Sequence, residues 1–235
     1  MRLVVLVLLL AACTRPLTPV ERSFVATVQG DRIDLDRVRI VKGALIGGIT
    51  STRPARPRVT CRERIGRPET TPTVSTSTAA FVLFNTVFYA TPYWREDFLA
   101  GYPETLPLGR AMLLTHELTH VWQWQNRAVT GYTPFKAATE HRPGGDPYLF
   151  DIADDRAFLE FDYEQQGALV EEFVCCRALA PDGVRTERLR QLLLPHFPAI
   201  ARAERVPRDR IELPYPEADL SGLCDEPAAE SAAAK

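Results

Sequence analysis

Hydrophobic and polar positions along the chain predict both helices and strands. In "LTPVERSFVATVQGD", Thr18 precedes Pro19 and Glu21, which is the capping pattern of a helix start. Apolar and charged residues then alternate over residues 33–40, as is typical of a half-exposed strand. The run "TAAFVLFNTVFYA" at residues 78–90 is rich in β-branched and aromatic residues and predicts a mostly buried strand.

The second half of the chain predicts two long helices. The first begins near Pro107 or Leu108 and ends before Gly131, and the second covers roughly residues 157–180. Between the two predicted strands, residues 51–78 combine arginine, proline, serine and threonine without periodicity. We expect this segment to be a long loop.

Together these elements predict one α+β domain over residues 18–215, with a small β-sheet packed on two helices. Residues 216–235 contain few core-forming side chains, and we expect a disordered tail there. A length of 235 residues and a hydrophobic content of 46% suffice for a buried core. The net charge of −2 gives no indication of nucleic-acid binding.

The N-terminus has the pattern of an export signal. Residues 1–12 combine a charged start with an apolar run that is shorter than the roughly 20 residues of a membrane-spanning helix. Leu-Ala-Ala followed by Cys13 resembles the bacterial lipobox, which predicts lipid attached to Cys13 and a short tether at residues 13–17. An ordinary signal peptide that is cut at a nearby small residue is the alternative.

This pattern places the mature protein in the cell envelope, on the periplasmic face of a membrane. Thr14 rather than aspartate follows the cysteine. By resemblance to enteric bacterial lipoproteins, this favours the outer membrane over the inner one.

Four further cysteines predict disulfides in such an oxidising compartment: Cys61, Cys175, Cys176 and Cys224. Adjacent cysteines rarely bridge each other, and on a helix their side chains diverge by about 100°. We therefore expect Cys61 and Cys224 to pair with the doublet, one each, in an order that the sequence leaves open. Free buried thiols are the alternative.

The segment "LLTHELTHVWQWQ" carries the strongest chemical signal. His116 and His120 are four residues apart, so on a helix they project from one face and can bind the same zinc ion. Glu117 can then accept a proton from a zinc-bound water as the general base. Two histidines on an apolar helix face need polar partners, and a metal supplies one for both.

A catalytic zinc site needs a third protein ligand, and "FLEFDYEQQGALVEEFV" offers several carboxylates. Glu164, Gly167 and Glu171 share one helical face, and the small residue permits close approach to the helix that carries the histidines. Glu164 is the favoured ligand, with Glu160 and Glu171 as alternatives.

Four segments resemble, in order, those of bacterial vgr-related proteins: "RPLTPVERSFVATVQGDRIDLDRVRI", "NTVFY", "HELTHVWQWQ" and "YEQQGALVEEF". That family is similar to the HExxH domain associated with extracellular contractile injection systems. The resemblance covers roughly residues 15–180 and implies a zincin-like α+β fold, with Glu164 as the third zinc ligand. It also implies a protein partner in the envelope or secretion machinery. The lipobox, the arginine-rich segment with Cys61, and Gly167 in place of alanine depart from the family pattern.

These observations predict a zinc metallopeptidase that cleaves a peptide or protein substrate. In zincins an edge strand just before the metal helix pairs with the substrate, and Phe81 to Tyr89 occupy that place here. His141, in the glycine- and proline-rich loop between the two helices, is a candidate donor to the oxyanion. Two alternatives stay open: a noncatalytic binding module that a metal stabilises, and a cell-wall amidase.

Overall fold

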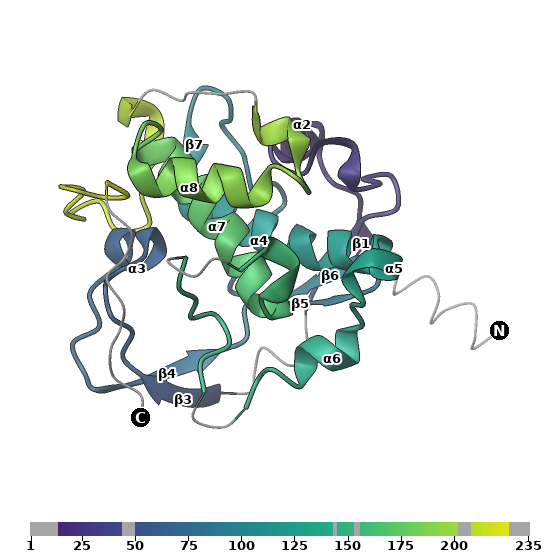
Figure 1. Cartoon of the computed structure of the whole chain (residues 1–235), viewed down its shortest axis with the longest axis horizontal. Helices are drawn as coiled ribbons and strands as arrows, with labels where there is room; N and C mark the ends of the chain where they lie inside the picture. The colour runs from purple at the N-terminus through teal and green to yellow at the C-terminus, as the bar shows by residue number, and fades with distance from the viewer. Residues whose placement is uncertain (1–13, 44–49, 143–144, 153–155, 202–207, 226–235) are drawn as a thin grey trace.

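The computed structural model describes residues 14–43, 50–142, 145–152, 156–201 and 208–225. The predicted signal peptide (residues 1–12) and lipidation site (Cys13) lie outside them. The strands are β1 (Thr14–Arg15), β2 (Arg39–Lys42), β3 (Thr50–Pro54), β4 (Thr73–Ser77), β5 (Ala80–Leu83), β6 (Thr86–Tyr89), β7 (Leu106–Pro107) and β8 (Ile211–Glu212). The longer helices are α2 (Pro19–Ala26), α3 (Cys61–Ile65), α4 (Leu108–Gln125), α5 (Arg127–Thr130), α6 (Pro134–Ala138), α7 (Tyr163–Leu179) and α8 (Val184–Leu193). The mixed α+β architecture is as predicted (Figure 1).

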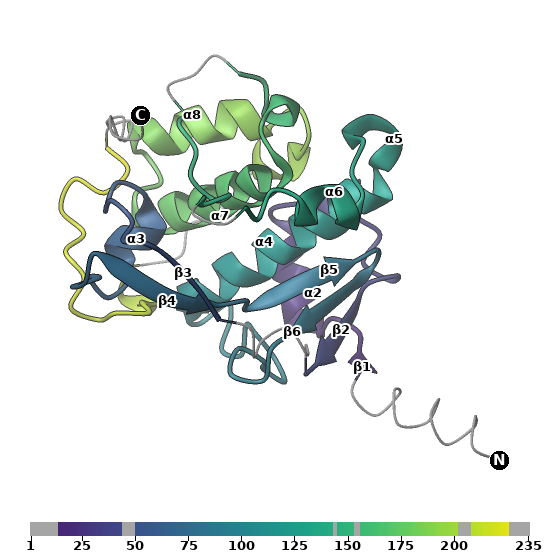
Figure 2. The ribbon, with the colours of Figure 1, turned by 90° about the horizontal axis from the view of Figure 1, so that it is seen from below.

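The central helix α4 lies between a sheet and a second long helix. Figure 2 shows the four-stranded sheet on one side of α4, and α7 and then α8 on the other. Contacts of α4 with β5, β6 and α7, and of α7 with α8, agree with this order. Both α4 and α7 are therefore buried over most of their surface, which explains why neither shows the one-sided apolar pattern of a surface helix.

The four-stranded sheet has the order β1-β2-β6-β5, and β5 lies at its end. β5 and β6 form an antiparallel hairpin, whereas the sequence predicted a single strand over residues 78–90. This difference from the prediction has a local cause: Phe84 adopts a left-handed backbone with φ of 58°, and the chain reverses there. The turn contains no glycine, the residue that most strongly predicts such turns from sequence.

The predicted strand over residues 33–40 is shorter than expected. Pairing with β6 begins only at Arg39. Before it, the carboxylate of Asp34 accepts the backbone N–H of Asp36, which makes a local turn that competes with a strand.

Residues 51–78 are not the unstructured loop that composition predicted. β3 and β4 pair antiparallel over five residues each, and α3 lies between them in sequence. Thr and Ser residues dominate the two strands, and threonine favours strands because it is β-branched. We call residues 50–77 the insert; Figure 2 shows its two strands beyond one end of α4, apart from the four-stranded sheet.

Both ends of the predicted domain extend further than expected. The predicted tether is part of the sheet: Thr14–Arg15 pair with β2, and the guanidinium of Arg15 binds the fully buried carboxylate of Glu21 through two hydrogen bonds. In the predicted disordered tail, Leu223 and Cys224 are buried. Residues 226–235 of that tail lie outside the described residues.

The predicted disulfides are present, and their order is now defined. Cys61 pairs with Cys175 and joins α3 to α7, whereas Cys176 pairs with Cys224 and joins α7 to the C-terminal segment. Within the described part of the chain, no helix is both long and apolar enough to span a membrane.

Candidate metal centre

The candidate site lies where α4 crosses α7. His116, Glu117 and His120 come from the middle of α4, and Glu164 comes from the first turn of α7. The helices approach closely because Gly167 faces the ring of His116. A Cβ atom at that position would lie 2.8 Å from His116 Cε1, which is closer than van der Waals contact allows.

Three side chains converge on one point. The Nε2 atoms of His116 and His120 each lie 3.2 Å from the same oxygen, Oε2 of Glu164. All three side chains are at least nine-tenths buried. Of the described residues, these three form the group of histidine and carboxylate side chains whose ligand atoms lie within 4.8 Å of one another.

His120 is held by a neutral chain of amides. Its Nδ1 lies 2.8 Å from Oε1 of Gln123. The Nε2 group of Gln123 donates to the carbonyl of Tyr163 and to Oε1 of Gln166, which fixes the orientation of its amide. Since Oε1 of Gln123 can only accept, Nδ1 of His120 carries a proton, which leaves Nε2 as the nitrogen that a metal would bind.

His116 is held by charged groups instead. Its Nδ1 lies 3.3 Å from Oε2 of Glu171, and the same oxygen lies 3.2 Å from Nη1 of Arg62 in the insert. The contact of Nδ1 with Glu171 is not aligned as a hydrogen bond, so this buried nitrogen has no hydrogen-bond partner. Glu171, an alternative ligand in the sequence, therefore lies on the outer side of His116, away from the point where the Nε2 atoms converge.

Two further predicted residues can be placed. His141 lies in the same site, because its Nε2 is 3.0 Å from Oε1 of Glu164, and its side chain is 45% exposed. Its neighbour Glu140 accepts the first two N–H groups of α7, from Tyr163 and Glu164, and so fixes the start of that helix. Glu160, the other alternative ligand, is exposed and accepts the N–H of Ala157 outside the site.

The site is electrostatically coupled. Burial alone lowers the pKa of His116, but contacts with Glu164 and Glu171 outweigh it and raise this pKa to about 10. Burial raises the pKa of Glu164, yet the surrounding histidines hold it well below its usual range. Burial raises the pKa of Glu117, although His116 and His120 act in the opposite direction. A raised carboxylate pKa suits a base that works near neutral pH.

The three converging side chains face a large cleft. Its volume is about 1120 Å³, and its lining includes Glu117, the edge strand β5, and residues of the insert. Tyr132 and Tyr148 also line it, with their rings 6.0 Å from His120 and 5.6 Å from His116, respectively.

These residues fit a bound metal ion. Two imidazole nitrogens and one carboxylate oxygen form a donor set that suits zinc. Both Nε2 atoms point at the same place, whereas Nδ1 of His120 bonds to Gln123 and Nδ1 of His116 faces Glu171, in the positions of outer contacts to metal ligands. The ring of His116 also occupies space that only a glycine at position 167 leaves open.

Several residues of the site were not predicted from the sequence. Gln123 follows His120 at a spacing of three, the spacing of side chains that meet on a helix, and this signal was available. Arg62, Tyr132 and Tyr148 had no such signal, because each comes from a segment whose path the sequence did not reveal.

No protein family matches the chain, and a search of curated proteins also gives no match. Among solved structures, the effector domain of Pseudomonas aeruginosa VgrG2b is similar over 78% of this chain and 83% of its own, with 19% sequence identity and a TM-score of 0.46. A similarity of this size does not establish a shared fold.

Proposed function

We propose that this protein is a zinc-dependent peptidase. The observation that carries the proposal is the convergence of His116, His120 and Glu164 on one point of a cleft in which Glu117 is the adjacent carboxylate. A metal that only stabilised the fold would need the three ligands but no base beside them. The zincin-like fold and its edge-strand substrate site are part of this proposal.

Each residue of the site has a defined task. When bound, zinc supplies Lewis-acid chemistry that makes a water nucleophilic at neutral pH. Glu117 accepts the proton that this water loses and returns it to the leaving amine. His141, partly exposed beside Glu164, donates a hydrogen bond to the carbonyl oxygen as negative charge develops on it.

The edge strand β5 is the proposed binding site for the peptide backbone. The N–H of Ala90 bonds to the carbonyl of Ala79, and hydrogen-bonded pairs alternate along an antiparallel ladder. Ala80 and Val82 therefore direct their backbone groups away from β6, and no described strand pairs with β5 on that side. An extended substrate can add there as a further strand.

The proposed setting is the cell envelope. Lipid on Cys13 would hold the protein on the periplasmic face, in the outer membrane rather than the inner one. The two disulfides suit such an oxidising compartment. Mass spectrometry of the membrane fraction should find diacylglyceryl cysteine at the new N-terminus, and an unmodified N-terminus would refute the anchor alone.

The decisive experiment separates metal binding from catalysis. The full-length chain is purified without chelators, its zinc content is measured, and it is incubated with a peptide library. We expect about one zinc per chain, as in three-ligand sites. Glu117→Gln should keep the zinc and lower kcat by at least about 100-fold, because glutamine cannot accept the proton.

Other results would favour the alternatives. Zinc without cleavage of peptides or peptidoglycan, in both the wild type and Glu117→Gln, would support a noncatalytic binding module. Cleavage of peptidoglycan amides but not of proteins would support an amidase. Absence of bound zinc would refute the proposal.

The edge-strand site has its own test. Ala80→Pro removes one outward N–H but no hydrogen bond of the hairpin, and proline is tolerated on edge strands. We expect a higher KM with unchanged zinc content, while the control Ala80→Val, which keeps the N–H, should leave KM near the wild-type value. Equal KM in the two folded variants would contradict substrate addition at β5.

A further inference from the structure

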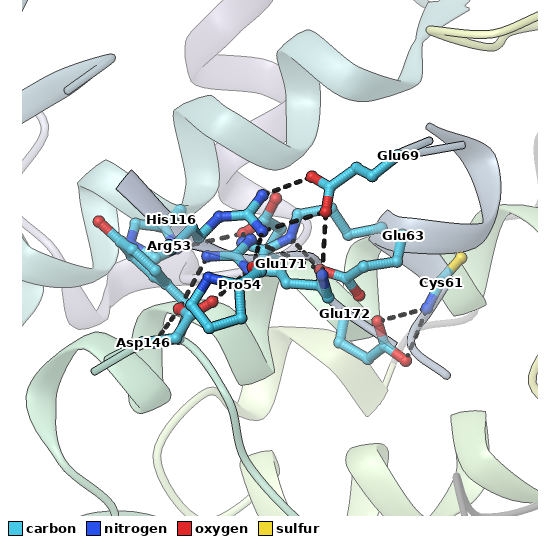
Figure 3. Close-up of polar contacts among 12 residues, drawn as sticks. Arg53, Pro54, Cys61, Glu63, Glu69, His116, Asp146, Glu171 and Glu172 are labelled. Carbon is cyan, nitrogen blue, oxygen red and sulfur yellow. Dashed lines mark hydrogen bonds and ion pairs between the residues drawn. The ribbon is translucent and has the colours of Figure 1, made fainter. Parts of the chain in front are cut away.

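The insert is fastened to α7 directly beside the candidate metal centre. Cys61 forms the disulfide with Cys175, and its backbone N–H, at the start of α3, donates to both carboxylate oxygens of Glu172, at 3.1 and 2.8 Å. The next residue, Arg62, contacts Glu171. Figure 3 shows Cys61 at Glu172, with Glu171 between this attachment and His116.

Arg62 is held in place from several sides. Its Nε donates to Oε1 of Glu63 at 3.0 Å, and Glu63 also pairs with Arg56 at 3.5 Å. Arg56 in turn binds both carboxylate oxygens of Asp146, which also lines the cleft. The guanidinium of Arg62 therefore has little freedom, and the carboxylate that it contacts is fixed as well.

Glu171 faces a nitrogen that needs an acceptor. When a histidine binds a metal through Nε2, its Nδ1 carries a proton, and an outer carboxylate or carbonyl usually accepts it. For His116 the group beside Nδ1 is Oε2 of Glu171, at 3.3 Å. Nδ1 makes no other hydrogen bond, so Glu171 is the acceptor that lies next to it.

We propose that Glu171 and Arg62 are positioning residues of the metal centre, and that the Cys61–Cys175 disulfide keeps them in register with His116. Glu171 accepts the Nδ1 proton, and Arg62 balances the charge of this buried carboxylate and fixes its rotamer. The insert is thus part of the metal centre, although it supplies no ligand. This inference rests on the proposed metal site but not on the proposed hydrolysis.

The chain contains a matched control for the disulfide. Cys176, next to Cys175 on α7, pairs with Cys224 of the C-terminal segment and forms no covalent bond to the insert. The C-terminal segment contacts the insert noncovalently: Arg64 of α3 donates hydrogen bonds to the carbonyls of Ser221 and Gly222. We expect removal of either bridge to destabilise the fold. Removal of Cys61–Cys175 breaks the covalent link between α7 and the α3 segment that carries Arg62, whereas removal of Cys176–Cys224 leaves that link intact.

The test measures zinc affinity in the full-length chain by competition with a chromophoric chelator under nonreducing conditions, far below the unfolding temperature. Glu171→Gln and Arg62→Met should each weaken zinc binding by about 10-fold or more, as loss of an outer contact does. Cys61→Ser with Cys175→Ser should weaken it in the same direction. Cys176→Ser with Cys224→Ser should leave it within about twofold of the wild type, because His116 keeps its contacts.

Two readouts exclude a merely structural role. If Arg62 acts through Glu171, the double variant Arg62→Met with Glu171→Gln should bind zinc no more weakly than Glu171→Gln alone. In protein loaded with Co²⁺, the visible absorption bands should shift in Glu171→Gln but not in the Cys176 and Cys224 control. If Glu171→Gln fails to fold, Glu171→Asp, which keeps the charge but shortens the reach, takes its place.

The outcomes are distinguishable. A wild-type chain that binds no zinc would overturn the proposed function. A wild-type chain that binds zinc tightly, with unchanged affinity and Co²⁺ spectra in the Glu171 and Arg62 variants, would overturn this inference and leave the proposed function standing.

Discussion

The two histidines of the candidate centre are supported in different ways. Nδ1 of His120 contacts the neutral amide of Gln123, which in turn bonds to the amide of Gln166; the two glutamines lie on α4 and α7 within the core. Nδ1 of His116 instead faces the charged pair of Glu171 and Arg62, and Arg62 comes from the insert. The amides beside His120, which we call the neutral support, therefore depend only on the packing of α4 against α7. The Glu171–Arg62 pair beside His116, which we call the charged support, depends on a separate segment that a disulfide holds in place.

This difference separates what the core contributes from what the insert contributes. A neutral amide chain needs no balancing charge when it is buried, so it survives as long as α4 and α7 stay packed. A buried carboxylate is costly without a partner, so Glu171 needs Arg62. The following changes test whether the two supports are independent.

The largest effect should come from the residue that both histidines share. Glu164→Ala removes the oxygen that lies 3.2 Å from each Nε2, and we expect it to lower zinc affinity by more than the roughly 100-fold that loss of an outer contact can cost. Glu171→Ala should cost less. Zinc analysis after dialysis checks the order, and zinc retained in Glu164→Ala but lost in Glu171→Ala would reverse the ligand assignment.

The neutral support is tested next. Gln123→Leu leaves the buried Nδ1 of His120 without its acceptor, and we expect zinc affinity to fall by about 10- to 100-fold. The free energy of unfolding should also fall by about 1–3 kcal/mol, the cost of an unsatisfied buried polar group. Gln125→Leu is the control on the same helix, because Gln125 bonds to Asp34 and Asn85 instead. Equal zinc affinity in both variants would show that the amide chain does not support the centre.

Much of the geometry of the candidate metal centre could be predicted from the sequence, because helix geometry is local. The spacing of His116 and His120 fixes their common face. The spacing along α7 placed Glu164 and Glu171 on one face, so Glu164 was the favoured ligand while Glu171 stayed an alternative. The cysteine doublet correctly predicted that each member has a distant partner.

The support of His116 could not be predicted in this way. Arg62 and Glu171 are 109 residues apart, and their contact depends on how the insert folds. The composition of the insert suggested a loop, because its two paired strands consist mainly of threonine and serine and show no apolar periodicity. The hairpin turn was missed for a related reason: it consists of Phe84 and Asn85, and a lone asparagine within an apolar run is a weak turn signal without a neighbouring glycine or proline.

A packing change tests how tightly the two helices define the site. In Gly167→Ala the added methyl group would overlap the ring of His116, and overpacking of this kind costs about 1–3 kcal/mol of stability. Because the displaced group is a proposed ligand, zinc affinity should fall as well. Gly109→Ala is the control: its Cβ would lie 3.3 Å from Pro214, away from the centre, so stability alone should respond. Thermal unfolding with and without zinc distinguishes the two.

The smallest expected effect is a change in the number of protons that zinc binding releases, and it distinguishes the two supports. Without metal, the pKa of His116 is raised to about 10, so at pH 8 the ring carries a proton that zinc must displace. Apparent zinc affinity should therefore rise with pH by up to about tenfold per unit for each proton released, and this rise should end as the pH passes that pKa. The pKa of His120 is also raised, because Glu164 outweighs the effect of burial, but Gln123 does not contribute to that shift. Calorimetry in buffers of different ionisation enthalpy counts the protons. Glu171→Gln removes one of the contacts that raise the pKa of His116 and should lower the number of protons released. Gln123→Leu should leave that number unchanged. Equal proton numbers in the two variants would show that the charged support does not act on His116.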